Sequence, residues 1–422
     1  MSQSTKIGVF GMGGRGQSLL EYAIMPACED MNVQVVAVYD PYEDRTREGA
    51  AIVERMTGKP CLAAQSEDDI LRDPEIAAVI IASSWESHVD LAVKAMKAGK
   101  YAAFEVGGAY SLQECWKLVE TSEETGIPCM MLENCCYGQR ELMITNMMRL
   151  GVLGDIVHCS GGYHHDLRDQ VAHGKDIRHY RLRNYLYRNC ENYPTHELGP
   201  IAKLLDINNG NRLVSLTSTA SCAKGLHEFI VRQHGAEHPL AQLSWAQGDV
   251  VTTTIRCAGG QTIVLTLDTT LPRAYSRAFT VRGTRGSYFE DTDCIFLDSE
   301  HHDYEWQPKK IWDNAKDYEE KYQHPLWKDY DPHEGQDNHG GMDYLVICAF
   351  FEAVQKGTQT PITVYDAATY MCISALSEDS IAQGGAPMAI PDFTRGKWYM
   401  RHDIDYSLKF NLDRDDPFRD LH

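Results

Sequence analysis

Residues 191–200 bring together side chains that can move protons. They read Glu-Asn-Tyr-Pro-Thr-His-Glu-Leu-Gly-Pro. A histidine has an unperturbed pKa of about 6.5, so His196 can act as an acid or a base near neutral pH. Tyr193, three residues earlier, would lie on the same side of one helical turn. The following apolar residues predict a helix that holds this group still. The structural alternative is a plain helix start, with Thr195 as the N-cap.

A glycine-rich turn near the N-terminus predicts dinucleotide binding. It follows the β-branched run 6–10 and precedes a helical run. Its glycines match the spacing G-x-G-x-x-G, which lets the backbone approach a pyrophosphate at a helix N-terminus. The residues expected to contact the cofactor here are Gly11, Met12, Gly13, Gly14, Arg15 and Gly16.

The second predicted strand, residues 33–39, ends at Asp40. An acidic residue at this place accepts hydrogen bonds from both ribose hydroxyls and repels a 2′-phosphate. Asp40 therefore favours NAD over NADP, although Arg45 would soften that preference. A turn cap is the structural alternative for Asp40.

Strands and helices alternate up to residue 132, which predicts a doubly wound parallel sheet in an α/β domain of the Rossmann type, residues 1–135. Ligands of such sheets bind beyond the carboxyl ends of the strands. The cofactor-contacting residues expected in the later loops are Ser84, Trp85, His88, Glu105, Val106 and Asn134. Glu133, at the end of the last strand, could hold the nicotinamide ribose or the substrate, and a helix-start cap is the structural alternative.

Residues 136–422 predict a second, α+β domain with a large, mostly antiparallel open sheet. Its strands are expected at 155–163, 213–218, 250–257, 262–269 and 278–282. Helices on one sheet face leave the other open, and a homo-oligomer, a dimer or a tetramer, commonly buries such a face. Residues 300–338 are polar without periodicity and are expected to form a long loop.

Composition restricts the partners. A net charge of -20 repels polyanions, so we expect no nucleic acid and no anionic membrane as a partner. No long apolar segment is present, which favours a cytoplasmic protein. The 13 cysteines are scattered and are expected to be reduced, and no metal-ligand spacing is found.

The N-terminal motifs resemble the glucose-fructose oxidoreductase, inositol dehydrogenase and rhizopine catabolism family. The resemblance rests on the glycine turn, on Trp85 and His88, on the run 98–100 and on Glu105. Members carry Glu-Lys-Pro after the fourth strand, and the lysine handles a substrate hydroxyl proton. Here Val106 replaces that lysine, so the proton must be handled by another side chain.

Longer motifs resemble the NAD-dependent glycosidases of glycoside hydrolase family 109. They are residues 133–137, 162–166, 192–196, 206–211, 271–276 and 339–343. The resemblance implies a redox-neutral reaction in which NAD⁺ oxidises the sugar C3 hydroxyl and thereby acidifies the C2 proton. The C1 oxygen then leaves by elimination, water adds, and the hydride returns to C3. This is not the two-carboxylate route of most glycosidases.

The resemblance also suggests roles in the site. His196 is the first choice for the C3 hydroxyl proton, and Tyr193, Tyr163 and Tyr275 are candidates for the C2 proton and the leaving group. A phenol has an unperturbed pKa of about 10 and needs a cation to become a useful base. Candidates for that cation are Arg168, Arg178 and Arg273. Residues expected to bind the sugar are Glu133, Asn192, His339 and Asp343. A structural role is the alternative for Asn192, and helix capping is the alternative for the last two.

Two other functions remain open at this stage. A sugar dehydrogenase with net redox chemistry would accumulate NADH. A non-catalytic sensor would bind NAD and a small glycoside without turnover. The sequence leaves open the sugar, the anomer and the aglycone.

Overall fold

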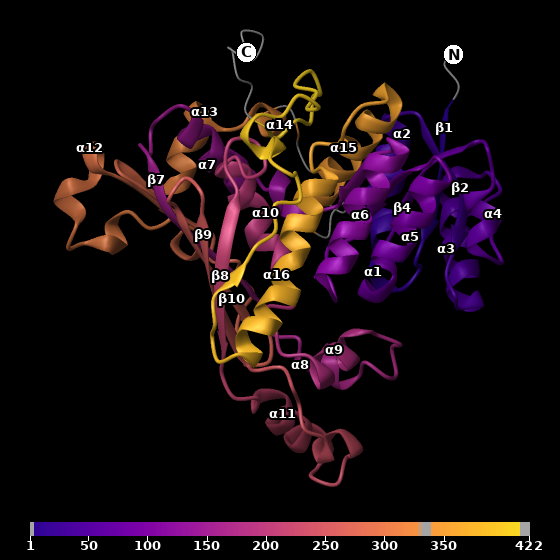
Figure 1. Ribbon diagram of the computed structural model, residues 1–422, viewed down its shortest axis with the longest axis horizontal. Coiled ribbons are helices and arrows are strands. Elements are labelled where there is room, and N and C mark those ends of the chain that lie inside the picture. Colours follow the sequence, from indigo (N-terminus) through magenta and orange to yellow (C-terminus); the bar gives the residue numbers. More distant parts are fainter. Residues whose placement is uncertain (1–3, 329, 331–338, 414–422) are drawn as a thin grey trace.

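A computed structural model describes residues 4–328, 330 and 339–413. Two sheets carry the fold, one in each half of the chain (Figure 1). The N-terminal sheet and its helices lie on one side of the molecule, the larger sheet lies on the other, and helix α16 (Val364–Ala382) runs between them.

The first sheet is six-stranded and parallel throughout, with the order β3-β2-β1-β4-β5-β6. Its strands are β1 Thr5–Phe10, β2 Val33–Tyr39, β3 Leu62–Ala63, β4 Ile76–Ile81, β5 Tyr101–Phe104 and β6 Cys129–Met131. The chain order reverses between β1 and β4, where such sheets bind their ligands. The predicted doubly wound Rossmann fold is confirmed, and β3 is an addition to it.

Helices connect these strands. They are α1 Gly14–Leu19, η1 Leu20–Ile24, α2 Met25–Asp30, α3 Glu43–Thr57, α4 Glu67–Leu71, α5 Trp85–Lys97 and α6 Leu112–Thr125. Helix α6 has a typical start and stop, because Ser111 accepts a hydrogen bond from the amide of Glu114 and Gly126 ends the helix at a φ of 68°.

The second sheet has eight strands in the order β13-β12-β11-β7-β10-β9-β8-β14. They are β7 Ile156–His164, β8 Leu213–Ala220, β9 Val250–Cys257, β10 Thr262–Asp268, β11 Thr280–Gly283, β12 Gly286–Phe289, β13 Cys294–Leu297 and β14 Met388–Ala389. The pair β7–β10 is parallel and the other pairs are antiparallel. The predicted mostly antiparallel sheet is confirmed, and β12, β13 and β14 were not predicted.

The second half of the chain also contains η2 Asn134–Tyr137, α7 Gln139–Arg149, α8 Arg168–Ala172, α9 Arg181–Tyr187, α10 Thr195–Leu204, α11 Gly225–His234, η3 Pro239–Gln242 and α15 Met342–Lys356. Helix α10 packs against β7 of this sheet and α16 packs against β8. The expected long loop over 300–338 is wrong for most of its described part, where short helical turns form. These are α12 Asp298–His301, η5 His302–Tyr304, η6 Pro308–Lys310, η7 Asn314–Tyr318, α13 Glu319–Tyr322 and α14 Pro325–Lys328. Residues 329 and 331–338 lie outside the part of the chain that the structure describes.

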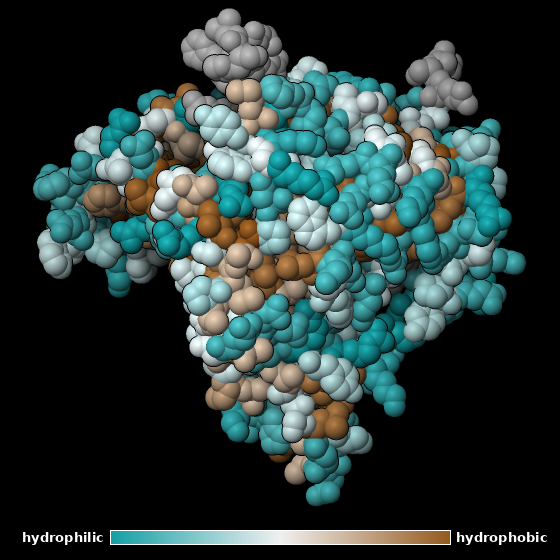
Figure 2. All heavy atoms as spheres, in the orientation of Figure 1, coloured by the Kyte–Doolittle hydropathy of each residue, from teal (hydrophilic) through white to brown (hydrophobic). Residues whose placement is uncertain are grey.

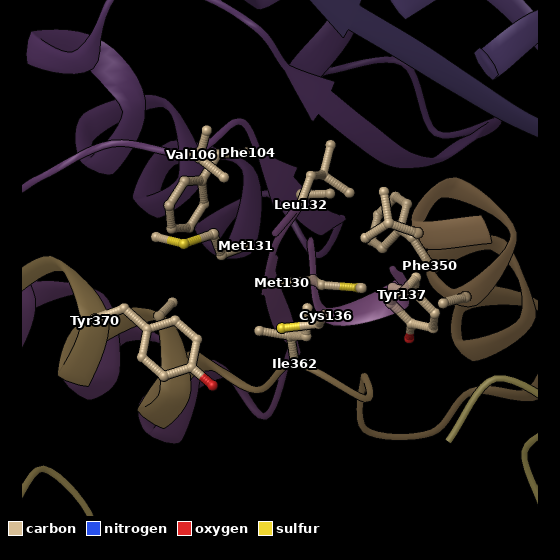
Figure 3. Packing of buried hydrophobic residues seen from close by; sticks show 14 of the residues in the cluster. Phe104, Val106, Met130, Met131, Leu132, Cys136, Tyr137, Phe350, Ile362 and Tyr370 are labelled. Carbon is tan, nitrogen blue, oxygen red and sulfur yellow. The ribbon is translucent and has the colours of Figure 1, made fainter. Parts of the chain in front are cut away.

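One apolar core joins the two halves of the chain. Figure 3 shows Leu132 and Met130 of the β6 segment beside Phe350 of α15 and Tyr137 of η2. Tyr370 of α16 belongs to the same buried cluster. The late helices α15 and α16 are therefore fixed against the end of the parallel sheet.

The outside of the molecule is largely hydrophilic on the face shown in Figure 2, with scattered apolar patches. Within the described part of the chain, no helix combines the length and the apolar character needed to cross a membrane. All thirteen cysteines are free thiols, as expected, and all but Cys222 are buried.

Candidate active site

Helix α10 places His196 in its first turn. The helix begins at Thr195, and the residue before it is Pro194, which makes no side-chain cap. The structural alternative, in which Thr195 is the N-cap, is therefore wrong. Every residue of the helix is buried, so the polar side chains of its first turn face the interior of the protein.

Glu133 orients His196. The Nδ1 atom of His196 lies 2.7 Å from Oε1 of Glu133, which is fully buried. The same oxygen accepts a hydrogen bond of 3.1 Å from the amide of Cys135. Glu133 therefore also caps the start of η2, which is the structural alternative given for it. Burial raises the pKa of Glu133, but the charge and the hydrogen bond of His196 outweigh burial and keep that pKa below its ordinary value. A carboxylate on Nδ1 leaves Nε2 of His196 to face the site.

Aromatic side chains gather around that nitrogen. The hydroxyl of Tyr193 lies 3.4 Å from Nε2 of His196. The ring of Tyr163 lies against that of Tyr193 with 4.2 Å between centroids and a tilt of 35° between the ring planes, and its hydroxyl is 2.9 Å from Nδ1 of His165. Tyr275, from the segment between β10 and β11, lies 5.3 Å from the His165 ring and 6.3 Å from the Tyr163 ring. The structure thus brings together all four side chains predicted to be catalytic.

Arg181 is the cation of this cluster, and the sequence reasoning missed it. Its guanidinium carbon is 5.2 Å from the Tyr193 ring centre and 5.5 Å from that of Trp85, and Nη1 donates to Gln170 at 2.6 Å. Burial raises the pKa of Tyr163, and the charge of Arg181 opposes that rise. For Tyr193 burial dominates, and the pKa is well above its ordinary value.

The three arginines named from the sequence lie elsewhere. Each is paired with a carboxylate of its own, so its charge is neutralised away from the tyrosines. Arg168 pairs with Asp166, Arg178 with Asp44 and Arg273 with Asp268. The expectation for these three is therefore corrected. Arg181 could have been found as the arginine at the start of a helix in the Arg- and Tyr-rich stretch, since α9 begins with it.

Two buried acids adjoin the same motif. Neither carboxylate oxygen of Glu191 has a hydrogen-bond partner, and the side chain is 1% exposed. Burial raises the pKa of Glu191 to about 8. Burial and the neighbouring Glu191 raise the pKa of Glu197 well above its ordinary value. Both acids therefore hold their protons at neutral pH.

The glycine turn leaves no room for side chains on its inner side. Gly11 has a φ of +87°, and a Cβ there would lie 2.4 Å from the amide of Ser83. A Cβ on Gly16 would lie 1.9 Å from the carbonyl oxygen of Gly11. Gly14 has open space instead, and at Gly13 the nearest atom would be Arg45 at 3.5 Å. The turn is therefore closed towards the protein and open towards the place of a ligand.

Asp40 supports this turn. Its Oδ2 accepts a hydrogen bond of 2.8 Å from the amide of Met12, and its Oδ1 accepts one from the amide of Tyr42. Arg45 donates to the carbonyl of Ile177. Asp40 therefore caps a turn, which is its structural alternative, and it also lies at the end of β2 as expected.

The loop after β4 contributes an aromatic wall. Ser84 precedes α5, and the Trp85 ring lies 5.7 Å from that of Tyr193. Nε2 of His88 is 3.0 Å from the carbonyl oxygen of Ser83, and burial lowers the pKa of His88 to about 4. His88 therefore stays neutral and holds this loop.

Arg15 is hydrogen-bonded to other residues that the sequence predicts to bind the cofactor or the sugar. Its guanidinium donates to Asp343 at 2.7 and 2.9 Å and to Glu105 at 2.9 and 3.2 Å. Asn134 donates to Asp343 at 2.7 Å, and Nδ1 of His339 lies 2.8 Å from the same carboxylate. Val106 is buried, and its amide donates to Glu105. Asp343 and His339 thus bind Arg15 of the glycine turn.

Asn192 is buried and donates a hydrogen bond to Oε1 of Gln247 at 3.0 Å, which favours a structural role for its side chain.

Glu133, Cys135 and His196 form a group that could hold a metal ion, because their ligand atoms lie within 4.8 Å of one another. In the structure, however, the hydrogen bond between His196 and Glu133 occupies two of those atoms.

The fold and the site define an enzyme with a Rossmann-type nucleotide-binding domain. Residues 5–132 match the family described as oxidoreductase family, NAD-binding Rossmann fold, and residues 137–400 match glycosyl hydrolase 109, C-terminal domain. The chain belongs to glycosyl hydrolase family 109 and is a glycoside hydrolase with an NAD-binding Rossmann domain.

Relatives support this membership. An alpha-N-acetylgalactosaminidase of Tannerella forsythia is 42% identical over 353 residues, which are 79% of this chain and 74% of the relative. A glycosyl hydrolase family 109 protein of Solibacter usitatus is 35% identical over 409 residues, covering 95% and 91%. A solved levoglucosan dehydrogenase in complex with NADH and levoglucosan shares the fold, with a TM-score of 0.68 at 19% identity over 92% of this chain and all of the other.

Proposed function

We propose that this protein cleaves small glycosides, N-acetylhexosaminides among them, by a redox-neutral reaction that depends on NAD⁺. The Glu133–His196 pair carries the proposal, because it sets a proton acceptor among tyrosines at the end of the parallel sheet. The Tannerella forsythia relative supports α-N-acetylgalactosaminides as the first substrates to test.

The residues present fit NAD. The inner side of the glycine turn is closed by Gly11 and Gly16, while Gly14 faces open space, which is the shape a pyrophosphate needs. The cofactor would be held by that turn, by Asp40 at the ribose and by the loops at Ser84, Trp85, Glu105 and Asn134. When bound, NAD would accept the C3 hydrogen of the sugar as hydride and return it at the end.

His196 would take the proton of the C3 hydroxyl through Nε2, since Glu133 engages Nδ1. Glu133 stabilises the positive charge that His196 then acquires. This assignment supplies the group that the family's missing lysine at Val106 would otherwise provide.

The tyrosines would handle the protons at C2 and at the leaving oxygen. Oxidation at C3 acidifies the C2 hydrogen, and a phenolate near Arg181 could remove it. A second phenol would donate its proton to the C1 oxygen as the C1–O bond breaks. Water then adds at C1, a proton returns to C2, the hydride and a proton return to C3 and its oxygen, and the free sugar leaves. Tyr163, beside Arg181, is our choice for the C2 proton, and Tyr275 for the leaving group.

The decisive experiment is turnover of aryl glycosides, starting with aryl α-N-acetylgalactosaminide, in deuterated water. We expect free sugar with deuterium at C2 and no accumulation of NADH. Free sugar without the C2 label would exclude elimination. NADH formed in proportion to product would instead support a sugar dehydrogenase, and binding without any turnover would support a sensor.

We also propose that the open face of the second sheet forms a homo-oligomer, a dimer or a tetramer, of a cytoplasmic protein. On β9 the exposed side chains Thr252, Thr254 and Arg256 alternate with buried ones, so this face carries no covering helix along that strand. Light scattering should give a mass that is a multiple of the chain mass, and Thr254→Glu should lower that mass.

The two domains of the chain are proposed as residues 1–135 and 136–422.

A further inference from the structure

The Arg15 network joins four segments that are far apart in the sequence. Arg15 lies in the glycine turn, Glu105 follows β5, Asn134 follows β6, and Asp343 lies in the first turn of α15. Both oxygens of Asp343 accept hydrogen bonds from Arg15, which gives the two-pronged geometry of a strong arginine–carboxylate pair. Two carboxylates thus hold one guanidinium at the edge of the sheet where the cofactor binds.

The carboxylate of Asp343 is held by a rigid support. Helix α15 packs on the nucleotide domain, because Tyr344 donates to Asp30 at 2.6 Å and Gln355 donates to the carbonyl of Met31 at 2.6 Å. Its Phe350 also lies in the shared core (Figure 3). Asp343 is 3% exposed and receives a further hydrogen bond from Asn134.

Charge keeps this contact in place near neutral pH. Burial raises the pKa of Asp343, but the charge of Arg15 and the hydrogen bonds of Arg15 and His339 outweigh burial and lower that pKa far below its ordinary value. The carboxylate is therefore ionised whenever the protein is folded near neutral pH.

We infer that Asp343 is a positioning residue that clamps Arg15 across the carboxyl edge of the parallel sheet and so retards the release of bound NAD. A redox-neutral reaction needs this retention, because the hydride taken from a sugar must return to the same sugar. The inference rests on the proposed use of NAD. It assigns the late helix α15 a role in holding the cofactor rather than the sugar.

The test measures cofactor release without any substrate. Protein loaded with NAD is moved into NAD-free buffer, and the NAD that remains bound is followed over time by native mass spectrometry. Asp343→Asn should release NAD roughly tenfold faster or more, because Arg15 loses its two-pronged carboxylate partner and is no longer held across the edge of the sheet. The matched control Asp90→Asn, which breaks the exposed pair with Lys117, should release NAD at the rate of the unmodified protein.

A second variant separates a clamp from general destabilisation. Arg15→Gln should also speed release, and adding Asp343→Asn to it should cause little further change, since both substitutions remove the same contact. Independent, multiplying effects would overturn the inference, as would an Asp343→Asn protein that keeps NAD as long as the unmodified one. An unmodified protein that binds no NAD would overturn both this inference and the proposed function.

Discussion

At the scale of single residues, the site works through pairs in which one side chain sets the state of another. Glu133 fixes the ring of His196, and Arg181 opposes the rise that burial causes in the pKa of Tyr163. Without these partners the ring of His196 would lose its fixed orientation, and a smaller fraction of Tyr163 would be ionised at neutral pH. The chemistry therefore depends on Glu133 and Arg181 as much as on the groups that would touch the sugar.

His196 gives the first prediction. His196→Ala should lower kcat for aryl glycosides by roughly 10²–10⁴-fold, which is the usual contribution of a positioned acid or base. NAD binding should persist, since His196 belongs to α10 and not to the glycine turn. His227→Ala, on the exposed side of α11, serves as the control and should keep full turnover. Full turnover by His196→Ala would remove the central assignment.

Arg181 gives a prediction about pH. The Arg181 charge lowers the pKa of Tyr163, so Arg181→Gln should raise that pKa. If Tyr163 works as a phenolate, the pH at which kcat rises should move upward, and activity at neutral pH should fall. Arg183→Gln is a matched control on the same helix, because the charge of Arg183 is paired with Glu86. An unchanged pH profile in Arg181→Gln would contradict this role.

At the scale of elements, the site depends on ends of strands and beginnings of helices. The glycine turn stands between β1 and α1, Glu105 and Glu133 follow β5 and β6, and His196 opens α10. Each end is fixed by its own backbone contacts, such as the Asp40 carboxylate on the amide of Met12. The side chains can therefore meet without long loops that would have to be ordered first.

The glycine turn gives a prediction about steric fit. Gly16→Ala should weaken NAD binding and lower the free energy of unfolding by roughly 1–3 kcal/mol, because its Cβ would meet the Gly11 carbonyl oxygen at 1.9 Å. Gly14→Ala, where the Cβ would meet no atom within 4 Å, should keep the melting temperature. Thermal unfolding and NAD titration measure both effects, and equal melting temperatures for the two variants would refute the argument.

At the scale of the whole molecule, one core unites the nucleotide domain with the late helices, so the stability of the two halves is linked. That core also encloses ionisable groups at the site. Buried acids without partners lower stability when the solution favours their ionised form. The dependence of stability on pH therefore reports on the buried site as well as on the surface.

Glu191 makes this measurable. Its unfolded form ionises near pH 4.3, whereas the folded form keeps its proton up to a pKa of about 8. The unfolded state thus binds fewer protons between these values, so stability falls as pH rises through this window. Glu191→Gln should reduce the loss of unfolding free energy between pH 5 and pH 8 by about 4 kcal/mol. Glu228→Gln, exposed on α11, is the control, and an unchanged loss in Glu191→Gln would contradict the buried neutral state.

Strand alternation and glycine spacing are local signals, so the parallel sheet, the glycine turn and the mostly antiparallel second sheet could be predicted without the structure. It also pointed to Tyr163, Tyr193, His196 and Tyr275, through motifs that are contiguous in the chain. Edge strands such as β3 and β14 are two residues long and carry no periodicity, so they escaped prediction.

Which charged side chains meet could not be predicted from the sequence. Arg181 rather than Arg168, Arg178 or Arg273 reaches the tyrosines, since each of those three has a carboxylate partner of its own. Likewise Asp343, more than three hundred residues from Arg15, proved to be its partner. Electrostatic contact depends on distance in space, and the sequence order of charged residues does not contain that distance.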